Sequence, residues 1–218
     1  MKRILALVLV AVLTLGLAAC GSQPAAPAQS SAPAASSNAP AAPAGDGLIK
    51  VGIVNNPPSE SGYRAANVAD FEKVFTEANG YKTSTFYSLK NDEQLNAAQQ
   101  FITDGVDYLL ISAAATDGWT SVLENAKQAG VKVFLFDRMM NVDESLFEAA
   151  VISDMRKQGE MAVKWLLDLN LPEYNVVHIQ GAMGSDAQIG RTGPLDEQFA
   201  SGKMKRVVQQ TATWDEAT

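Results

Sequence analysis

The stretch LIKVGIVNNPPSESGYRAAN, Leu48–Asn67, passes from an apolar run through a polar loop into residues with helical spacing. The run Leu48–Val54 predicts a buried strand. After the loop, the segment Tyr63–Asn79 predicts a helix that ends at Gly80. The helix carries its apolar residues on one face: Val68, Phe71, Phe75 and Ala78. A strand followed by a helix in this way is the repeating unit of an α/β fold.

The same succession of strand and helix repeats along the rest of the chain. Six more strands are predicted at Lys82–Tyr87, Tyr108–Ala113, Val131–Phe136, Glu148–Ser153, Asn175–Gln180 and Arg206–Thr213. The helix after the second strand begins at Asn91, which with Gln94 makes a predicted capping box. The later helices are predicted at Trp119–Ala129, along an apolar stripe from Met155 to Leu169, and near Ile189–Ala200. This alternation predicts parallel sheets covered by helices on both faces, with right-handed crossovers.

Ligands of such sheets bind at the carboxyl ends of the strands, so the loops that follow strands are the candidate sites. Five loops meet this condition: Asn55–Gly62, Ser88–Asn91, Ala113–Gly118, Asp137–Asn141 and Gly181–Gln188. In the first, Tyr63 and Arg64 begin a helix. An aromatic ring can stack on the C–H face of a sugar, and a guanidinium can donate paired hydrogen bonds to its hydroxyls. The alternative is a solvated Arg64 and a Tyr63 that packs on the helix start.

Two further loops carry charges at strand ends. The run FLFDR places Asp137 and Arg138 directly after an apolar strand, where they either bind a ligand's hydroxyls or pair with each other. The segment GAMGSDAQIGR, 181–191, follows a later strand and ends in Arg191. Its glycines allow close approach of a ligand, but no Walker lysine follows, so a phosphate cradle is not indicated. Pro194 lies early in the following helix and removes a backbone hydrogen bond there if it stands beyond the first turn.

The N-terminus has the features of a secretory signal. A basic start is followed by an apolar run from Ile4 to Ala19, which is short of the roughly 20 residues that span a bilayer. The run ends in Leu-Ala-Ala-Cys, which resembles the lipobox of bacterial lipoproteins and predicts lipidation of Cys20. An ordinary cleaved signal with an incidental cysteine is the alternative. We therefore expect residues 1–19 to be a signal peptide and the protein to be lipid-anchored on the outer face of the cell membrane.

Residues 20–47 are rich in Ala, Pro and Ser and lack bulky apolar side chains. Such a segment cannot offset the entropy of ordering, so it predicts a disordered tether. Cys20 is the only cysteine, which excludes a disulfide within one chain. The chain has 17 basic and 24 acidic residues, and loss of Lys2 and Arg3 with the signal leaves 15 basic residues. Such an acidic surface repels nucleic acid, and no basic stripe is present.

Taken in order, several of these motifs together resemble a known family. They are the lipobox, the tether, ESGYR after the first strand, FLFDR, GSDAQIGR and the terminal ATWDEAT. The pattern is similar to the sugar-binding proteins of bacterial ABC importers, in the ribose- and galactofuranose-type branch of the type I periplasmic binding proteins. The resemblance covers Leu48–Thr218. It implies two doubly wound α/β lobes, of which 48–152 is the first and 153–218 is part of the second.

The resemblance also implies where a sugar binds, namely in the cleft between the lobes. Tyr63 is similar to the stacking aromatic residue of the family, which is tryptophan in the galactofuranose type, and Arg64 to the arginine beside it. Asp137 and Arg138 resemble the pair that binds hydroxyls, and Arg191 the arginine of the second lobe. Asp186 and Trp214 lie near cleft positions but match less closely. The implied partners are a monosaccharide and an ABC permease, with no catalytic residue, metal or cofactor, and we expect a monomer.

Pro194 departs from the family, which commonly has glycine there. A larger departure is that the family continues for roughly 100 residues beyond the position of Thr218, so the resemblance predicts a second lobe that is incomplete here. An incomplete lobe leaves sheet edges and apolar surface uncovered. We therefore expect this span alone to be unstable or to aggregate, and a cooperative, monomeric melting transition would contradict that expectation.

Three other classes of function are a receptor for signalling, a cell-surface enzyme and a sugar-responsive repressor. A receptor that serves a membrane sensor or captures a sugar-like signalling molecule would have the same cleft, and the sequence does not separate it from a transport protein. A cell-surface enzyme is disfavoured, because there is no nucleophile elbow, no second histidine beside His178 and no cluster of metal ligands. His178 is read as a strand residue, and Asp92-Glu93 and Asp143-Glu144 as helix-start and loop charges. The sugar-responsive repressors have a DNA-binding domain where this chain has its lipobox.

Overall fold

The computed structural model describes residues 47–214, and the predicted signal, the lipidated Cys20 and nearly all of the tether lie outside the described residues. Five strands form one parallel sheet in the order β2-β1-β3-β4-β5. The strands are β1 (Ile49–Asn55), β2 (Tyr81–Tyr87), β3 (Tyr108–Ile111), β4 (Lys132–Asp137) and β5 (Ala149–Ile152). The direction of winding reverses between β1 and β3, and such a switch point is where open α/β sheets bind ligands.

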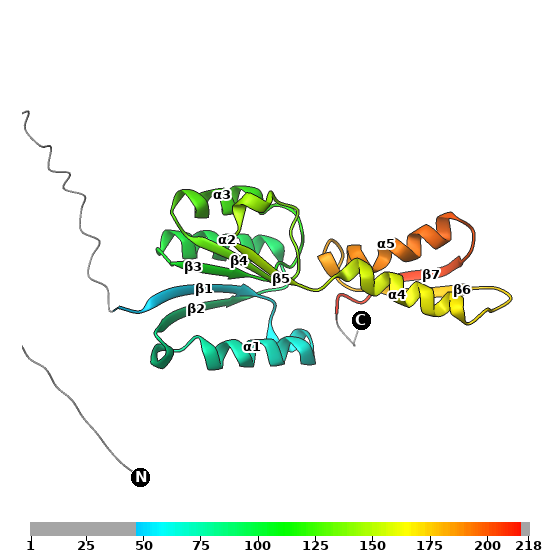
Figure 1. Ribbon diagram of the computed structural model, residues 1–218, viewed down its shortest axis with the longest axis horizontal. Helices are drawn as coiled ribbons and strands as arrows, with labels where there is room; N and C mark the ends of the chain where they lie inside the picture. The colour runs from blue at the N-terminus through cyan, green and yellow to red at the C-terminus, as the bar shows by residue number, and fades with distance from the viewer. Residues whose placement is uncertain (1–46, 215–218) are drawn as a thin grey trace, which may run out of the picture. The chain divides into compact units, whose positions relative to one another are not determined.

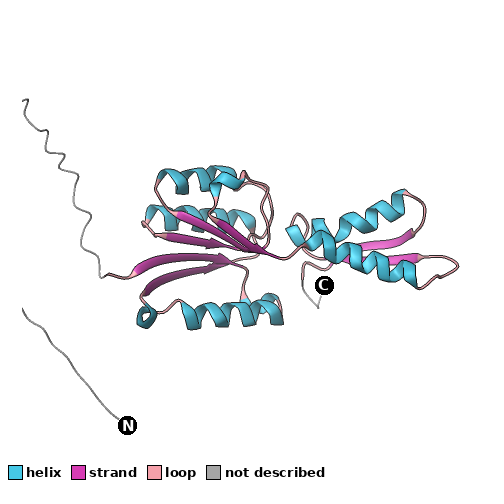
Figure 2. Ribbon diagram, viewed as in Figure 1, coloured by secondary structure: helices cyan, strands magenta, loops and turns pink. Residues whose placement is uncertain are grey.

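Helices cover both faces of this sheet, as the alternating pattern predicts. The helix α1 (Gly62–Val74) lies on one face, and α2 (Asn91–Thr103) and α3 (Thr120–Gln128) lie on the other (Figure 1). Three short 3-10 helices interrupt the loops: η1 (Pro58–Glu60), η2 (Glu77–Asn79) and η3 (Glu144–Leu146). Each crossover from one parallel strand to the next requires such a covering segment, and Figure 2 shows the resulting alternation along the chain.

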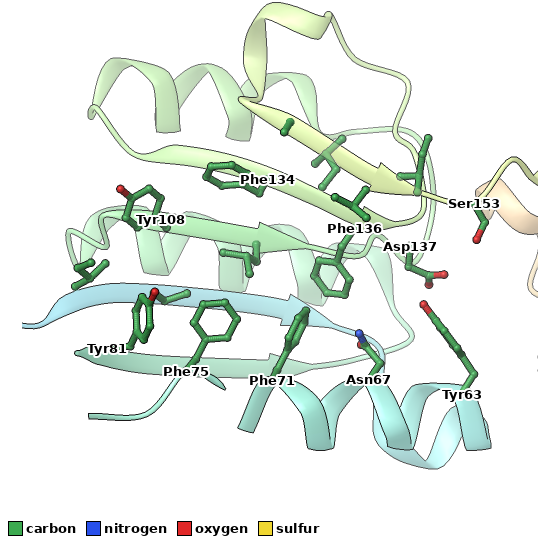
Figure 3. A pocket seen from close by; sticks show the side chains of 17 residues that line it. Tyr63, Asn67, Phe71, Phe75, Tyr81, Tyr108, Phe134, Phe136, Asp137 and Ser153 are labelled. Atoms are coloured by element: carbon green, nitrogen blue, oxygen red, sulfur yellow. The ribbon is translucent and has the colours of Figure 1, made fainter. Parts of the chain in front are cut away.

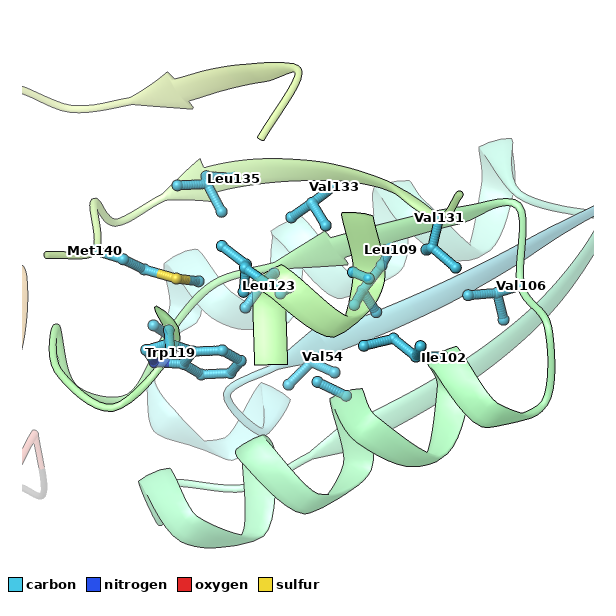
Figure 4. Close-up of a cluster of buried hydrophobic side chains, with 14 residues drawn as sticks. Val54, Ile102, Val106, Leu109, Trp119, Leu123, Val131, Val133, Leu135 and Met140 are labelled. Atoms are coloured by element: carbon cyan, nitrogen blue, oxygen red, sulfur yellow. The ribbon is translucent and has the colours of Figure 1, made fainter. Parts of the chain in front are cut away.

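The core lies between the sheet and the α2–α3 layer. Val54, Leu109 and Leu135 point from three adjacent strands into a cluster closed by Leu123 and Trp119 (Figure 4). Trp119 is the largest fully buried side chain, and its indole N–H donates to the Ala115 carbonyl at 3.0 Å. The cluster therefore anchors the loop after β3, one of the five loops that the sequence marks as candidate sites.

A second, smaller sheet follows in the chain. Its strands β6 (Asn175–Gln180) and β7 (Lys205–Thr211) are parallel. They are accompanied by α4 (Met155–Asp168) and α5 (Asp186–Ala200). Together with the five-stranded sheet, this arrangement confirms the predicted fold class, α/β with parallel sheets. Within residues 47–214, no helix is both long enough and apolar enough to cross a membrane.

Several apolar side chains of the smaller sheet and its helices are exposed. They include Val177, Ile179, Val207, Val208, Met161 and Trp165. The alternation along β6 explains part of this set, because Val176, His178 and Gln180 point to the more buried side and Val177 and Ile179 to the other. His178 is thus half-buried on a strand, in agreement with its interpretation from sequence. The expected instability of this span stays a prediction.

Two local predictions were wrong. The first helix ends at Val74 rather than Asn79, and Ala78 is exposed in η2, not on the apolar face of α1. Gly80, with φ of 89°, ends η2 instead. The capping box at Asn91 and Gln94 does not form either. Lys90 is the N-cap and makes no side-chain capping bond, while Gln94 is fully buried.

Other boundaries of strands and helices shift by a few residues, and Pro194 lies more than one turn inside α5 without ending it.

The acidic pairs Asp92-Glu93 and Asp143-Glu144 lie at a helix start and in a loop, as the sequence predicts. Glu93 accepts from Lys90 and Ser88, and these two hydrogen bonds lower the pKa of Glu93. Asp143 accepts from the Ser145 N–H at the start of η3.

The helices α4 and α5 meet through glycines. A Cβ at Gly159 would lie 2.6 Å from the Arg191 carbonyl oxygen, and one at Gly190 would lie 2.6 Å from the Met155 Cβ. Real Cβ atoms do not approach backbone so closely, so a side chain at either position requires the helices to separate. The backbone of Arg191, a predicted site residue, is therefore set directly by Gly159.

We expect Gly159→Ala to lower the stability of the full-length protein by about 1–3 kcal/mol, the usual cost of overpacking. Gly62→Ala, at the start of α1, is the control, because its added methyl meets no atom within 4 Å. The control gains helix propensity of up to about 1 kcal/mol. Thermal unfolding followed by circular dichroism compares the two. Equal melting temperatures for both variants would show that the close helix contact is absent in solution.

Candidate functional site

The candidate site lies at the carboxyl ends of β1 and β4, next to the switch point. The loop after β1 leads through η1 into α1, and the Ser61 Oγ accepts the Arg64 N–H at 3.2 Å as the N-cap of that helix. This cap fixes the first turn of α1, which contains Tyr63 and Arg64. Both side chains therefore start from the N-terminal end of the helix, next to the end of β1. Asp137 and Arg138 arrive from the last residue of β4 and the one after it.

Arg64 is fully buried and its donors are already engaged. The Nε donates to Glu60 Oε2 at 3.0 Å, Nη1 to Asn55 Oδ1 at 2.8 Å, and Nη2 to Asp137 Oδ2 at 2.5 Å. A longer contact of 3.4 Å joins Nη1 to Asn67 Oδ1. The solvated alternative for Arg64 is thus excluded by the structure. Its predicted role as a free donor to a ligand also changes, because most of the N–H groups of its guanidinium already donate to protein side chains.

Asp137 combines a strained backbone with a shared carboxylate. Its φ is 63°, in the left-handed region that few residues other than glycine adopt, although Asp and Asn tolerate it best. The Oδ2 atom accepts from Arg64 and, at 3.3 Å, from Ser112 Oγ, and it lies 3.5 Å from Arg138 Nε. These contacts converge on Oδ2, and the same carboxylate also meets the Tyr63 phenol and lines the cavity.

Arg138 is 5% exposed and pairs chiefly with Glu60 rather than with its neighbour Asp137. Its Nη2 donates to Glu60 Oε1 at 2.8 Å, and Nη1 donates to the Ala113 carbonyl at 3.4 Å. The ion pair between Asp137 and Arg138, which the sequence offered as the alternative, therefore exists only as the longer of the two ionic contacts of Arg138. Glu60 was not among the predicted site residues, although its place four residues before Arg64 is the spacing of a helical ion pair.

A network of buried side-chain amides, from Asn56 and Gln94, holds the Glu60 carboxylate in place. Asn56 Nδ2 donates to Glu60 Oε1 at 2.6 Å and Gln94 Nε2 donates to Asn56 Oδ1 at 2.9 Å. Gln94 Oε1 in turn accepts the Ala114 N–H at 2.8 Å. This network explains why Gln94 turns inward instead of capping α2. It ties the loops after β1 and β3 to the same carboxylate.

Tyr63 is 58% exposed and presents its ring to the cavity. Partial burial raises the pKa of its phenol, and the charge of Asp137 and a hydrogen bond to it raise that pKa further. Figure 3 shows the phenol oxygen directed toward the Asp137 carboxylate. The Arg64 guanidinium lies 5.4 Å from the ring centroid. An exposed, electron-rich ring fixed beside a carboxylate is suited to stack on a sugar.

The other three predicted site residues follow the five-stranded sheet in the chain: Asp186 and Arg191 belong to α5, and Trp214 lies after β7. Arg191 is exposed and its Nε donates to Gln158 Oε1 at 2.8 Å. The centroid of the Trp214 ring lies 5.9 Å from the Arg138 guanidinium and 5.8 Å from that of Arg191. Its Nε1 is buried and meets no acceptor among residues 47–214. Asp186 instead accepts the Met139 N–H at 3.0 Å.

A cavity of about 250 Å³ joins these groups. It is lined by Glu60, Ser61, Tyr63, Arg64, Asp137, Arg138, Met155, Ala187, Arg191 and Trp214. The structure therefore brings together six of the seven predicted ligand-binding residues, and Asp186 is the one outside the lining. The volume lies just below the roughly 300–1,000 Å³ of drug-sized ligand pockets, which suits a small polar molecule.

A larger hollow of about 700 Å³ lies on the α1 face of the five-stranded sheet (Figure 3). Its lining is mainly aromatic and aliphatic, with Phe71, Phe134 and Phe136 at its centre. The only charged side chain in the lining is Asp137, at one end. Because this hollow offers few hydrogen-bonding groups, the smaller charged cavity is the better candidate for binding a polar ligand.

Comparison with known proteins agrees with this fold. The family model described as "Periplasmic binding protein domain" matches residues 51–218. The galactofuranose-binding protein of Escherichia coli (strain K12) is 37% identical over 185 residues, which cover 81% of this chain and 54% of that protein. The fructose import binding protein of Bifidobacterium longum is 29% identical over 99% of this chain and 63% of its own length.

Solved structures give the same result. The crystal structure of a galactofuranose binding protein has a TM-score of 0.68 at 31% identity, covering 76% of this chain and 57% of that one. The arabinose-transporter binding protein from Shewanella sp. ANA-3, bound to L-arabinofuranose, has a TM-score of 0.67 at 30% identity, covering 77% and 56%. The chain thus spans a little over half the length of these structures and of the Escherichia coli protein. By its sequence and its fold, this chain belongs to the periplasmic binding protein domain family, in the branch that includes the galactofuranose-binding proteins.

Proposed function

We propose that this protein is a non-enzymatic receptor that captures a monosaccharide and delivers it to an ABC-type importer. The observation that carries the proposal is the 250 Å³ cavity, where Asp137 and Arg138 meet Arg191 and Trp214. Carboxylate and guanidinium groups bind vicinal hydroxyls, and aromatic rings cover the apolar face of a sugar. The names of the relatives, which bind galactofuranose or import fructose, support a sugar as the ligand.

Within this proposal, residues 48–152 are the first lobe and 153–218 belong to the second. The Asp137 carboxylate accepts from a sugar hydroxyl, and the exposed donors of Arg191 reach the same sugar from the second lobe. Tyr63 and Trp214 supply the two stacking faces, and the Trp214 Nε1–H, which meets no acceptor among residues 47–214, is available to a hydroxyl oxygen. Contacts from both lobes stabilise the closed form, which the permease recognises. Asp186 acts at the junction, where it holds the Met139 backbone, rather than on the sugar.

The proposed ligand is a pentose or hexose in its furanose form. Support comes from two similar structures, at 31% and 30% identity, which are those of a galactofuranose binding protein and of a binding protein with L-arabinofuranose bound. A single monosaccharide also suits the small volume of the cavity. The protein acts as a monomer, anchored through Cys20 and the tether to the outer face of the cell membrane, without a metal or cofactor.

Isothermal titration calorimetry of the full-length protein tests the proposal. The panel contains D-galactose, L-arabinose, D-fructose, D-ribose and D-xylose, whose solutions contain different furanose fractions. We expect saturable 1:1 binding of at least one sugar, and a preference that follows the furanose form when the titration is repeated with the methyl furanosides. Absence of binding to every sugar of the panel would overturn the proposal.

A further inference from the structure

We propose that Glu60 is a positioning residue of the sugar site. Its carboxylate binds the two buried guanidiniums, those of Arg64 and Arg138, and so leaves the Asp137 carboxylate available to the ligand. This inference rests on the proposed sugar-binding function. Both oxygens of Glu60 are used: Oε2 accepts from Arg64 at 3.0 Å and Oε1 accepts from Arg138 at 2.8 Å. Its side chain is 4% exposed, so these bonds are hardly screened by solvent.

The charges around the cavity show why this carboxylate matters. Arg64 and Arg138 bring two positive charges to the first-lobe wall, and Glu60 and Asp137 bring two negative ones. With Glu60 in place, Arg138 is held mainly by Glu60 and lies 3.5 Å from Asp137, a long contact. Without its charge, both guanidiniums have only Asp137 as an anionic partner. Asp137 is then bound by guanidiniums from both sides and is less available to a sugar hydroxyl.

The position of Glu60 is itself fixed by uncharged groups. Asn56 Nδ2 donates to Oε1 at 2.6 Å, and Gln94 holds Asn56 while it also binds the backbone of the loop after β3. Glu60 is the last residue of η1, directly before the Ser61 cap of α1. The carboxylate thus stands at a point where three separate loops meet. A residue in that position sets geometry for the site whether or not it touches the sugar.

The test compares Glu60→Gln, which removes the charge but keeps the shape, with Glu60→Asp, which keeps the charge on a shorter side chain. Glu72→Gln, on the exposed side of α1, is the matched control. The probe is the tightest-binding sugar of the panel D-galactose, L-arabinose, D-fructose, D-ribose and D-xylose. We expect Glu60→Gln to weaken binding at least about tenfold, since hydrogen bonds to charged groups contribute about 1.5–3 kcal/mol. Glu60→Asp should lose less, and Glu72→Gln should bind as the wild type does.

A double-mutant cycle separates positioning from general destabilisation. If Glu60 acts by keeping Asp137 free, Glu60→Gln should change binding less than about threefold once Asp137 is replaced by Asn. A crystal structure of Glu60→Gln should show the Arg138 guanidinium moved onto the Asp137 carboxylate, a result that does not depend on which sugar binds. Fully additive losses in the cycle, or an unmoved Arg138, would overturn the inference.

The outcome also distinguishes this inference from the proposed function. If the wild type binds a sugar and Glu60→Gln binds it within threefold, the positioning role is refuted and the sugar-receptor function stands. If the wild type binds no sugar of the panel, the proposed function fails and the inference fails with it. Melting temperatures of each variant without sugar are recorded alongside. Loss of binding in a variant that melts like the wild type supports positioning.

Discussion

Asp137→Ala is expected to weaken sugar binding by the full-length protein at least about thirtyfold. The substitution removes the acceptor that faces the cavity and leaves Arg64 without its 2.5 Å partner. Truncating one partner of a buried, hydrogen-bonded charge pair costs about 2–5 kcal/mol, which corresponds to roughly 30-fold to several thousandfold in affinity. Calorimetry with the tightest-binding sugar of the panel measures the effect. Undiminished binding by Asp137→Ala would remove Asp137 from the site.

Asp137→Asn is the control that separates charge from backbone strain. Asn adopts the left-handed conformation about as readily as Asp, whereas Ala at φ of 63° is strained. Both variants lose the charge, so both should lose most of the sugar affinity. Only Asp137→Ala should also lower the melting temperature through strain at the end of β4. If Asp137→Asn bound normally, the carboxylate charge would have no role in recognition.

Arg64→Ala is expected to destabilise the full-length protein by about 3–5 kcal/mol, because it leaves Glu60 and Asp137 buried with one cation fewer. For a protein of this size, that corresponds to a melting temperature lower by roughly 6–20 °C. Thermal unfolding in the absence of sugar, followed by circular dichroism, measures the effect. The expected size reflects the complete burial of Arg64 and its contacts with three different side chains.

Lys73→Ala is the matched control on the same helix. Lys73 also pairs with a carboxylate, Asp70, at 3.0 Å, but its side chain is 73% exposed. Exposed pairs contribute about 0–1 kcal/mol, so this variant should melt within a few degrees of the wild type. A stable Arg64→Ala protein that no longer binds sugar would contradict a structural role. It would restore the simpler interpretation of Arg64 as a free donor to the ligand.

Much of the fold follows from local patterns in the chain. Strand and helix positions were predicted within a few residues because apolar residues repeat with period 2 or 3.6, and that pattern is written in consecutive residues. The first helix was extended too far because Ala78 continues the helical spacing by chance, while the chain already turns at Phe75. The capping box failed because a tertiary partner, Asn56, binds Gln94 more favourably than the helix end does.

The candidate site was predicted less completely than the fold. The expectation that Tyr63, Asp137 and Arg138 lie together follows from parallel topology, which places the carboxyl ends of strands at one edge. Glu60 was overlooked because a glutamate in a polar loop has no local feature that marks it as buried. The assignment of Asp186 to the cleft came from resemblance alone, and the structure pairs it with the Met139 backbone instead.

The sequence by itself determined the α/β class, the parallel strands and the edge of the sheet where the polar residues gather. These properties depend on hydrophobic periodicity and chain connectivity, which neighbouring residues specify. Only the tertiary structure decided which of those polar groups remain free for a ligand. Arg64 and Arg138 are largely occupied, while Asp137 and Trp214 line the cavity and Trp214 Nε1 meets no acceptor among residues 47–214. The reason is physical: a buried charge binds whichever opposite charge the fold brings nearest. Here the closest charged partners of Asp137 and Arg138, which are Arg64 and Glu60, stand more than 70 residues away in the chain.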